Sequence, residues 1–224
     1  MRISESVSSD PPQDRTAYYL KMRALAREKR SLYNVETDKL NIPFLERIYK
    51  KEQIKIDRRR MRGNKIRATY FCDDGDCSIL LNQSLPRAPK MFALAHELKH
   101  HYVDQQLILD GRIRCGDYNR NEFIEKSAEV FAAEFIYPEA EMRALAESMG
   151  IDARTCAKEK IVDFKRACPA CVSYIFIVKR FERFGFCPKG AYDGVKFQNL
   201  EEEIYGVPPY KQEWLKRRRA RKKG

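Results

Sequence analysis

The chain of 224 residues is long enough for one compact domain with appendages, or for two small domains. Hydrophobic residues make up 43% and charged residues 34%, a balance that supports a buried core and excludes a wholly disordered chain. Lys and Arg number 44 against 32 Asp and Glu, which gives a formal net charge of +12.

The distribution of apolar residues excludes two classes of protein. The longest apolar run, residues 171–178, is far shorter than the roughly 20 residues that a membrane span needs. The first residues are polar and contain no hydrophobic signal segment, so we expect neither a secreted nor an integral membrane protein. Seven cysteines without a regular spacing favour a reducing compartment over a disulfide scaffold, which predicts a cytoplasmic protein.

The N-terminal part of the chain is predicted to be helical after a disordered start. Residues 1–14 are polar and rich in Pro and Ser, a composition typical of disorder. Apolar periodicity predicts a helix over residues 16–32. A second helix is expected from Pro43, because proline is well tolerated at a first helical position.

A short sheet is predicted next. Residues 54–57 alternate as a strand, and residues 66–71 and 78–81 are typical of two more strands. The Asp74-Gly75 step between the last two predicts a tight hairpin turn.

Helices are predicted to dominate the remainder of the chain. A helix beginning near Lys90 is apolar on most of its circumference, which predicts that it is central to the domain. Residues 104–120 are mixed polar and are interpreted as a loop. Further helices are predicted over residues 121–137, 139–149, 151–166 and 172–184, followed by an irregular extension.

This order of elements predicts an α+β fold, with a small antiparallel sheet packed on a helical core and a helical C-terminal subdomain. We expect a disordered segment over 1–14, a main domain over 15–150, a helical subdomain packed on it over 151–187, and an irregular extension with a basic tail over 188–224.

Two basic runs carry much of the positive charge. Seven positive charges lie between Lys216 and Lys223, and a second cluster lies between Arg58 and Arg67. These runs predict a weak nucleic-acid contact through unspecific electrostatics. The alternative interpretation is a solvated tail and a solvated edge strand, because blocks of like charge are usually exposed to water.

All three histidines of the chain lie within residues 96–101, where residues 96 to 100 spell H-E-x-x-H. On a helix, His96 and His100 lie on the same face one turn apart, a separation that allows two imidazoles to share one tetrahedral metal ion. Glu97 lies beside that site, where a carboxylate can take a proton from water. His101 lies one residue off this face.

A catalytic zinc usually has three protein ligands, and no further histidine is left to provide the third. Glu125 and Glu129 lie one turn apart at the edge of the predicted apolar stripe of helix 121–137. Glu125 is the candidate third ligand, and Glu129 is the candidate acceptor for the second N–H of a ligand histidine. Cys115, in the preceding loop, is an alternative ligand.

Two motifs of the chain resemble the ImmA/IrrE family of metallopeptidases. That family typically has a strand ending in Asn, a Phe-x-x-Ala-His-Glu-Leu-Gly-His helix, and a Glu-x-x-Ala-Asn-x-Phe-Ala-Ala-x-Leu-Leu-Met-Pro helix. Similar sequences occur here at residues 79–82, 92–100 and 125–138, and Val172-Ser173 with Lys179-Arg180 is similar to a later helical segment of the family. The resemblance covers roughly residues 40–187.

The resemblance implies a zincin-like metallopeptidase domain with a gluzincin-like site, in which His96, His100 and Glu125 bind zinc and Glu97 is the general base. Manganese is the alternative ion. It also implies an endopeptidase that cleaves a helix-turn-helix repressor and so induces stress-response, prophage or mobile-element genes. A donor to the developing oxyanion is also needed, and the candidates are Tyr118, Tyr102 and His101.

Two residues depart from the family pattern. Lys99 stands where the family usually has Gly, and it is expected to place a long cation beside the site. Glu129 stands where the family usually has Asn. These departures and the basic runs motivate two alternatives, namely a regulator that binds its repressor without cutting it and a protein that binds DNA directly.

The Cys168-Pro-Ala-Cys171 motif is interpreted as small residues between two helices. A structural metal site using Cys168, Cys171 and Cys187 is the alternative, although a zinc ribbon needs a second pair of this kind. Residues 151–187 could be interpreted as a DNA-binding helix-turn-helix, but residues 174–178 are too apolar for a recognition helix that faces a DNA groove. We therefore expect a helical subdomain that forms part of the repressor-binding surface.

Overall fold

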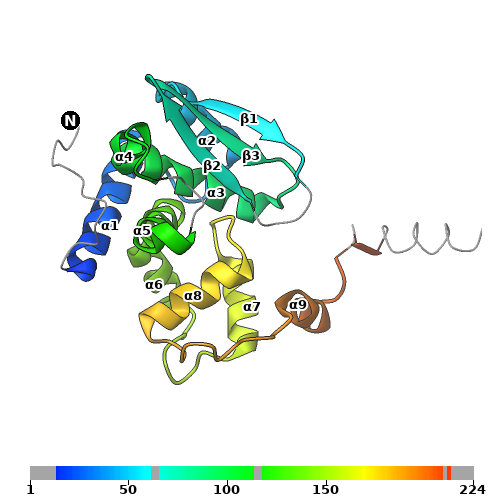
Figure 1. Cartoon of the computed structure of the whole chain (residues 1–224). Helices are drawn as coiled ribbons and strands as arrows, with labels where there is room; N and C mark the ends of the chain where they lie inside the picture. The colour runs from blue at the N-terminus through cyan, green and yellow to red at the C-terminus, as the bar shows by residue number, and fades with distance from the viewer. Residues whose placement is uncertain (1–13, 62–65, 114–117, 209–210, 213–224) are drawn as a thin grey trace, which may run out of the picture. The chain divides into compact units, whose positions relative to one another are not determined.

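A computed structural model describes residues 14–61, 66–113, 118–208 and 211–212 of the chain (Figure 1). The chain forms two compact units. The first comprises the chain up to Arg143 together with Pro169–Ser173, and the second comprises Ala144–Cys168 and the chain from Tyr174 onward. None of the described helices is long and apolar enough to cross a membrane.

The first unit begins with two helices that are capped by side chains. The carboxylate of Asp14 accepts hydrogen bonds from the first turn of α1 (Arg15–Leu32), and the amide oxygen of Asn41 does the same for α2 (Ile42–Lys51). These caps satisfy backbone N–H groups that have no partner within the helix. Pro43 lies in the first turn of α2, so both helices occur where the sequence predicts them.

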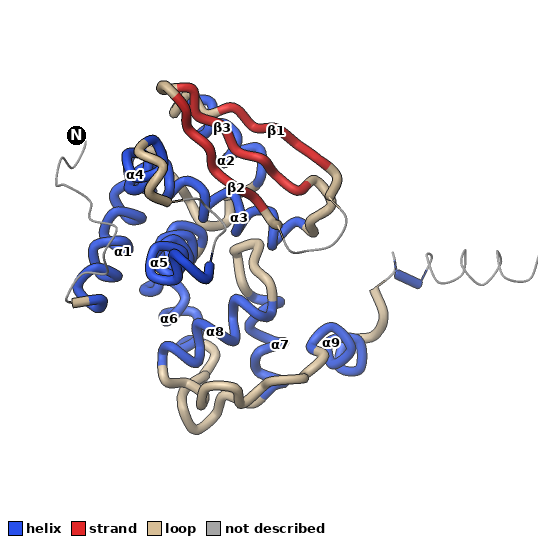
Figure 2. Tube along the Cα trace, viewed as in Figure 1, coloured by secondary structure: helices blue, strands red, loops and turns tan. Residues whose placement is uncertain are grey.

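Three strands form one sheet in the order β1-β3-β2, drawn red in Figure 2. β2 (Ala68–Asp73) pairs antiparallel with β3 (Asp76–Asn82), as predicted, whereas β1 (Lys55–Arg59) pairs parallel with β3. The α+β class is confirmed, but the expected antiparallel sheet is mixed. A parallel pair needs a crossover, and no local signal marks where the chain after β1 returns to the sheet.

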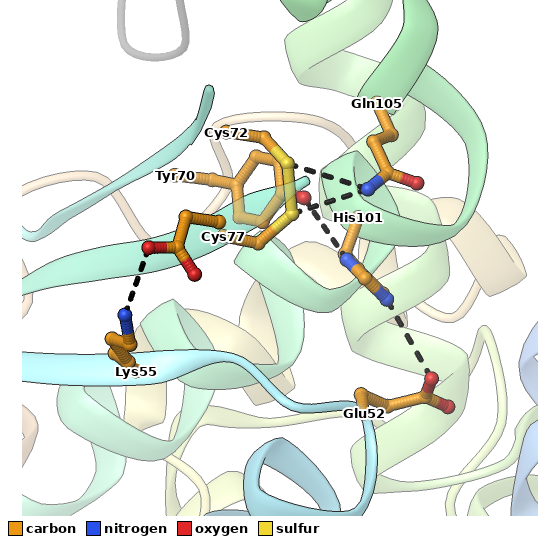
Figure 3. The surroundings of a disulfide bond; sticks show 8 residues. Glu52, Lys55, Tyr70, Cys72, Cys77, His101 and Gln105 are labelled. Atoms are coloured by element: carbon orange, nitrogen blue, oxygen red, sulfur yellow. Dashed lines mark hydrogen bonds and ion pairs between the residues drawn. A yellow bond between two sulfur atoms is a disulfide. The ribbon is translucent and has the colours of Figure 1, made fainter. Parts of the chain in front are cut away.

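The hairpin between β2 and β3 has the turn that its sequence predicts. Asp74 and Gly75 have φ angles of 43° and 86°, and a type I′ turn requires positive φ at both central residues. Cys72 and Cys77 lie directly opposite each other and form a disulfide, and the side-chain amide of Gln105 donates to both sulfurs at 3.3 and 3.1 Å (Figure 3). The disulfide follows from the strand register, so cysteine spacing alone gave no sign of it.

Helix α3 (Arg87–Lys99) is the central helix of the first unit. It packs against β2, β3, α2 and α5 (Tyr118–Ile136), and α5 in turn packs along α1. Strands β2 and β3 bury alternate residues, as period-2 side-chain geometry requires. The stripe of α5 that the sequence predicts to be buried, Ile124, Ala128, Phe131 and Phe135, is buried, but other faces of the helix are buried as well, including Glu125 and Ala132.

The chain does not leave α3 as a loop. It continues through a π-helical turn, η1 (His100–Asp104), into a short helix, α4 (Gln105–Leu109). The interpretation of residues 104–120 as a loop is therefore wrong for this stretch. A π turn changes the register of a helix by one residue, and apolar periodicity does not reveal it.

The second unit is a small helical body. Helix α6 (Glu139–Ser148) crosses the boundary between the units, and α7 (Lys158–Ala167) packs against α8 (Tyr174–Phe184) and α9 (Phe197–Tyr205). The helix predicted over residues 172–184 is confirmed, whereas the extension expected to be irregular contains α9. A T-shaped pair of aromatic rings, Phe164 and Phe181, lies in the core with centroids 4.9 Å apart.

Candidate metal centre

The H-E-x-x-H segment lies where the C-terminal end of α3 meets the π turn. His96 and Glu97 belong to the last turn of α3, and His100 is the first residue of η1. His100 is fully buried, and the side chain of His96 is 13% exposed. The segment therefore presents its two imidazoles from within the core of the first unit, with limited access to water.

Helix α5 brings Glu125 to the two histidines. Its Oε2 lies 3.0 Å from Nε2 of His96 and 3.9 Å from Nε2 of His100, and the two Nε2 atoms are 3.2 Å apart. One potential ligand atom of each residue lies within 4.8 Å of the others. The structure thus brings together the three residues that the sequence singled out, although Glu125 lies 29 positions after His96 in the chain.

These groups have the chemistry of a divalent metal site. Two imidazole nitrogens and one carboxylate oxygen converge so closely that, without a metal ion between them, they would have to share protons. Two histidines and one carboxylate are also the donor set of many catalytic zinc sites. Glu97 adds a second sign, because its Oε2 is buried and has no hydrogen-bond partner among the described residues. A buried acceptor is costly unless a donor reaches it, and a water molecule drawn to a metal ion would be such a donor.

The electrostatics of the centre distinguish its acidic and basic groups. Burial raises the pKa of Glu97, although His96 and His100 act against the shift. Burial alone would lower the pKa of His96, but the hydrogen bond to Glu125 and the charges of Glu97, Glu125 and Glu129 outweigh it, and the pKa is raised. The pKa values of both Glu97 and His96 are thus shifted by burial and by charged neighbours, a combination that is typical of functional sites.

A buried ion pair next to His100 was not foreseen. Nδ1 of His100 lies 2.7 Å from Oδ2 of Asp104, and Nζ of Lys99 lies 2.9 and 2.6 Å from the two oxygens of the same carboxylate. The sequence predicted Lys99 as a cation beside the site, but its ammonium is fully buried and paired with Asp104. The sequence interpretation places Asp104 in a loop, and only its spacing of four residues from His100 is a signal for this contact.

Glu129, the predicted acceptor, lies close enough to His96 to influence it. It is half-buried and contributes to the electrostatics of His96, whereas Asp104 holds the second nitrogen of His100. The sequence-based prediction considered only carboxylates on helix 121–137 as acceptors and so did not include Asp104.

The three candidate oxyanion donors differ in their surroundings. Nδ1 of His101 lies 2.9 Å from the hydroxyl of Tyr70, and its Nε2 lies 3.6 Å from Glu52 (Figure 3). The ring of Tyr102 is half-buried, lies 6.1 Å from that of Phe131 and has the ammonium of Lys29 4.4 Å from its centroid. The side chain of Tyr118, like Cys115, lies outside the described residues.

Other candidate sites gain no support. Cys168 and Cys171 are half-buried and form no disulfide within the described residues, and no cluster of three or more possible metal ligands among those residues contains them or Cys187. In the basic run on the edge strand β1, Arg58 pairs with Glu46 and Arg59 with Asp57. The basic run at 216–223 lies outside the part of the chain that the structure describes.

Residues 50–168 match the model of the peptidase M78 family, described as the IrrE N-terminal-like domain. This match covers more than half of the 224 residues. The chain belongs to this family. The resemblance to ImmA/IrrE proteins is therefore confirmed, and the matched region contains His96, Glu97, His100 and Glu125 within a metallopeptidase-family domain. No curated protein matches the chain.

Proposed function

We propose that this M78-family protein is a zinc-dependent endopeptidase. The observation that carries the proposal is the convergence of His96, His100 and Glu125 beside the buried, unpartnered Oε2 of Glu97. Manganese is the alternative ion, since imidazole and carboxylate donors also accept it.

The three converging residues would hold the ion through two imidazole nitrogens and one carboxylate oxygen, which leaves a position open for water or substrate. A bound divalent ion supplies Lewis acidity and lowers the pKa of water toward neutrality. Helices α3 and α5 hold these side chains in a packed core, so the donors are already oriented before an ion arrives.

Glu97 is the proposed general base. Its Oε2 accepts the proton of the attacking water and then delivers it to the nitrogen of the leaving amine. Burial serves this role, because a raised pKa brings the carboxylate closer to the pH at which it must both take and release a proton. The Tyr70 backbone lowers this pKa and so favours the ionised form that can act as a base.

The substrate we propose is a helix-turn-helix transcriptional repressor in the cytoplasm. A peptidase domain acts on a protein, and the ImmA/IrrE resemblance supports a regulatory target whose cleavage induces stress-response, prophage or mobile-element genes. The helical second unit is the proposed contribution to repressor binding.

The proposal is tested with the zinc-loaded protein and the product of a neighbouring repressor gene. We expect one zinc ion per chain and cleavage of the repressor, lost on chelation and restored by zinc. Glu97→Gln should retain zinc but not cleave. Glu203→Gln, the same substitution at an exposed position on α9, is the matched control and should cleave normally. The proposal would be contradicted if the native protein left the repressor uncleaved, or if Glu97→Gln cleaved it as well as the native protein does.

A non-proteolytic regulator predicts a different pattern. Such a protein would relieve repression equally well as Glu97→Ala, because binding does not need a general base. The charge of Lys99, which motivated this alternative, is neutralised by Asp104 in the core. A reporter assay with the two proteins therefore separates cutting from binding.

A further inference from the structure

The buried carboxylate of Asp104 joins two groups of the first unit. It accepts from Nδ1 of His100 at 2.7 Å and from Nζ of Lys99 at 2.6 Å. The ammonium also lies 3.4 Å from the backbone oxygen of Ile124 on α5, next to Glu125 in the chain. Asp104, Lys99 and His100 are all fully buried, so this arrangement exchanges no hydrogen bonds with bulk water.

The π turn makes the arrangement possible. Lys99 and Asp104 are five positions apart, and in an α-helix such residues point in directions that differ by about 140°. A π turn bonds residue i to residue i+5 and so brings position 104 round toward position 99. The same turn keeps Asp104 within reach of His100, four positions earlier. The π turn is therefore the backbone feature that lets Asp104 contact both Lys99 and His100.

The positive charge of Lys99 and the negative charge of Asp104 compensate each other within this cluster. A lone buried carboxylate is costly, and Lys99 offers it an opposite charge with two hydrogen bonds. With Lys99 bonded to both of its oxygens, the carboxylate of Asp104 is paired as an anion. A carboxylate anion has acceptors only, so its partner on His100 must be an N–H group.

An imidazole that donates from Nδ1 has its lone pair on Nε2. In His100, Nε2 is the atom that faces His96 and Glu125. A hydrogen bond of this kind fixes both the tautomer and the orientation of a ligand histidine.

We propose that Asp104, neutralised by Lys99, is a positioning residue that holds His100 with Nε2 free to bind the metal ion. This inference rests on the metal centre of the proposed function. It explains the lysine that departs from the family pattern, because a carboxylate buried at position 104 needs a counter-charge and a lysine at position 99 reaches it.

Two double variants separate positioning from packing. Lys99→Met/Asp104→Asn and Lys99→Met/Asp104→Leu both remove the ion pair, but only the first keeps an oxygen that can accept from His100. We expect zinc affinity, measured by competition with a chromophoric chelator, to stay near native in the Asn variant and to be about 10- to 100-fold weaker in the Leu variant. Equal affinities would overturn the inference, because a merely structural pair would affect both alike.

His96→Ala serves as the reference for the metal centre itself. If the native protein binds zinc no better than His96→Ala, the proposed site fails and this inference fails with it. If the native protein binds zinc tightly and the two double variants do not differ, only the positioning role fails.

A measurement on the native protein covers the case in which a double variant does not fold. Long-range ¹H–¹⁵N correlation spectra of the zinc-loaded protein report which ring nitrogen of each histidine carries a proton. We expect His100 to carry its proton on Nδ1, with a downfield shift typical of a hydrogen bond to a carboxylate. A proton on Nε2 of His100 would overturn the proposal.

Discussion

The two compact units bury different kinds of side chain. In the first, the packing of α3, η1 and α5 encloses a group of ionisable residues: Glu97, Lys99, His100, Asp104 and Glu125. In the described part of the second unit, the buried residues are apolar except for Arg180, with an aromatic pair at the contact of α7 and α8.

The comparison distinguishes apolar burial, which stabilises a core, from the burial of ionisable groups, which can make a core reactive. Apolar burial contributes free energy of folding in proportion to area and needs no partners. Buried charges are costly unless each one is matched, and the first unit matches Lys99 with Asp104 but leaves Glu97 with an unpartnered oxygen. The mismatch lies in the centre that carries the proposed chemistry, as expected when a site accepts a local cost for reactivity.

The largest expected effect is on catalysis. Glu97→Gln keeps the size of the side chain but removes the proton acceptor, so we expect the cleavage rate to fall about 10²- to 10⁴-fold. Zinc content and far-ultraviolet circular dichroism should stay native. A fall in rate accompanied by loss of zinc would instead indicate that Glu97 shapes the metal site.

The next effect concerns the matched pair. Lys99→Met leaves Asp104 buried without a counter-charge, and we expect a loss of about 3–5 kcal/mol in the free energy of unfolding. Urea denaturation of the native and variant proteins measures the loss. The double variant Lys99→Met/Asp104→Asn, which removes both charges but keeps an acceptor for His100, should recover most of it. Additive losses would contradict the view that the charges cost energy only when unmatched.

A packing variant in the second unit provides the contrast. Phe164→Ala removes a fully buried ring that meets Phe181, and we expect a destabilisation of about 3–5 kcal/mol from lost contacts and the remaining cavity. Unlike the loss of stability in Lys99→Met, the loss in Phe164→Ala should not be recovered by removing a second, charged side chain, and it should not depend on salt concentration. Zinc binding by the folded variant, followed by chelator competition, should remain native.

The smallest effect is a dependence on pH in the metal-free protein. The pKa of Glu97 is raised above its ordinary value of 4.5, so its folded state binds a proton more tightly than its unfolded state. The associated stability is fully present below pH 4.5 and is lost as pH rises through the folded-state pKa. The native protein should therefore lose stability relative to Glu97→Gln as the pH rises above 4.5. Parallel stability curves would show that burial does not perturb this carboxylate.

Local signals predicted much of the fold. The Asp74-Gly75 turn followed from the few residue pairs that tolerate positive φ, and the helix caps at Asp14 and Asn41 lie at the expected starts of α1 and α2. Non-local features were missed, namely the parallel pairing of β1 and the Cys72–Cys77 disulfide. Both depend on which strands become neighbours, and no short stretch of sequence contains that information.

For the candidate site, the sequence by itself determined that His96 and His100 lie one helical turn apart with Glu97 beside them, because helical geometry fixes this separation whatever surrounds it. It offered Glu125 as the third ligand and left Cys115 as an alternative. Only the tertiary structure decided that α5 lies against α3 at the register that brings Glu125 to both rings, and that a π turn carries Asp104 back to Lys99 and His100. Helix periodicity is a local property of the chain, whereas packing register and a one-residue shift in helical pitch depend on contacts between distant segments.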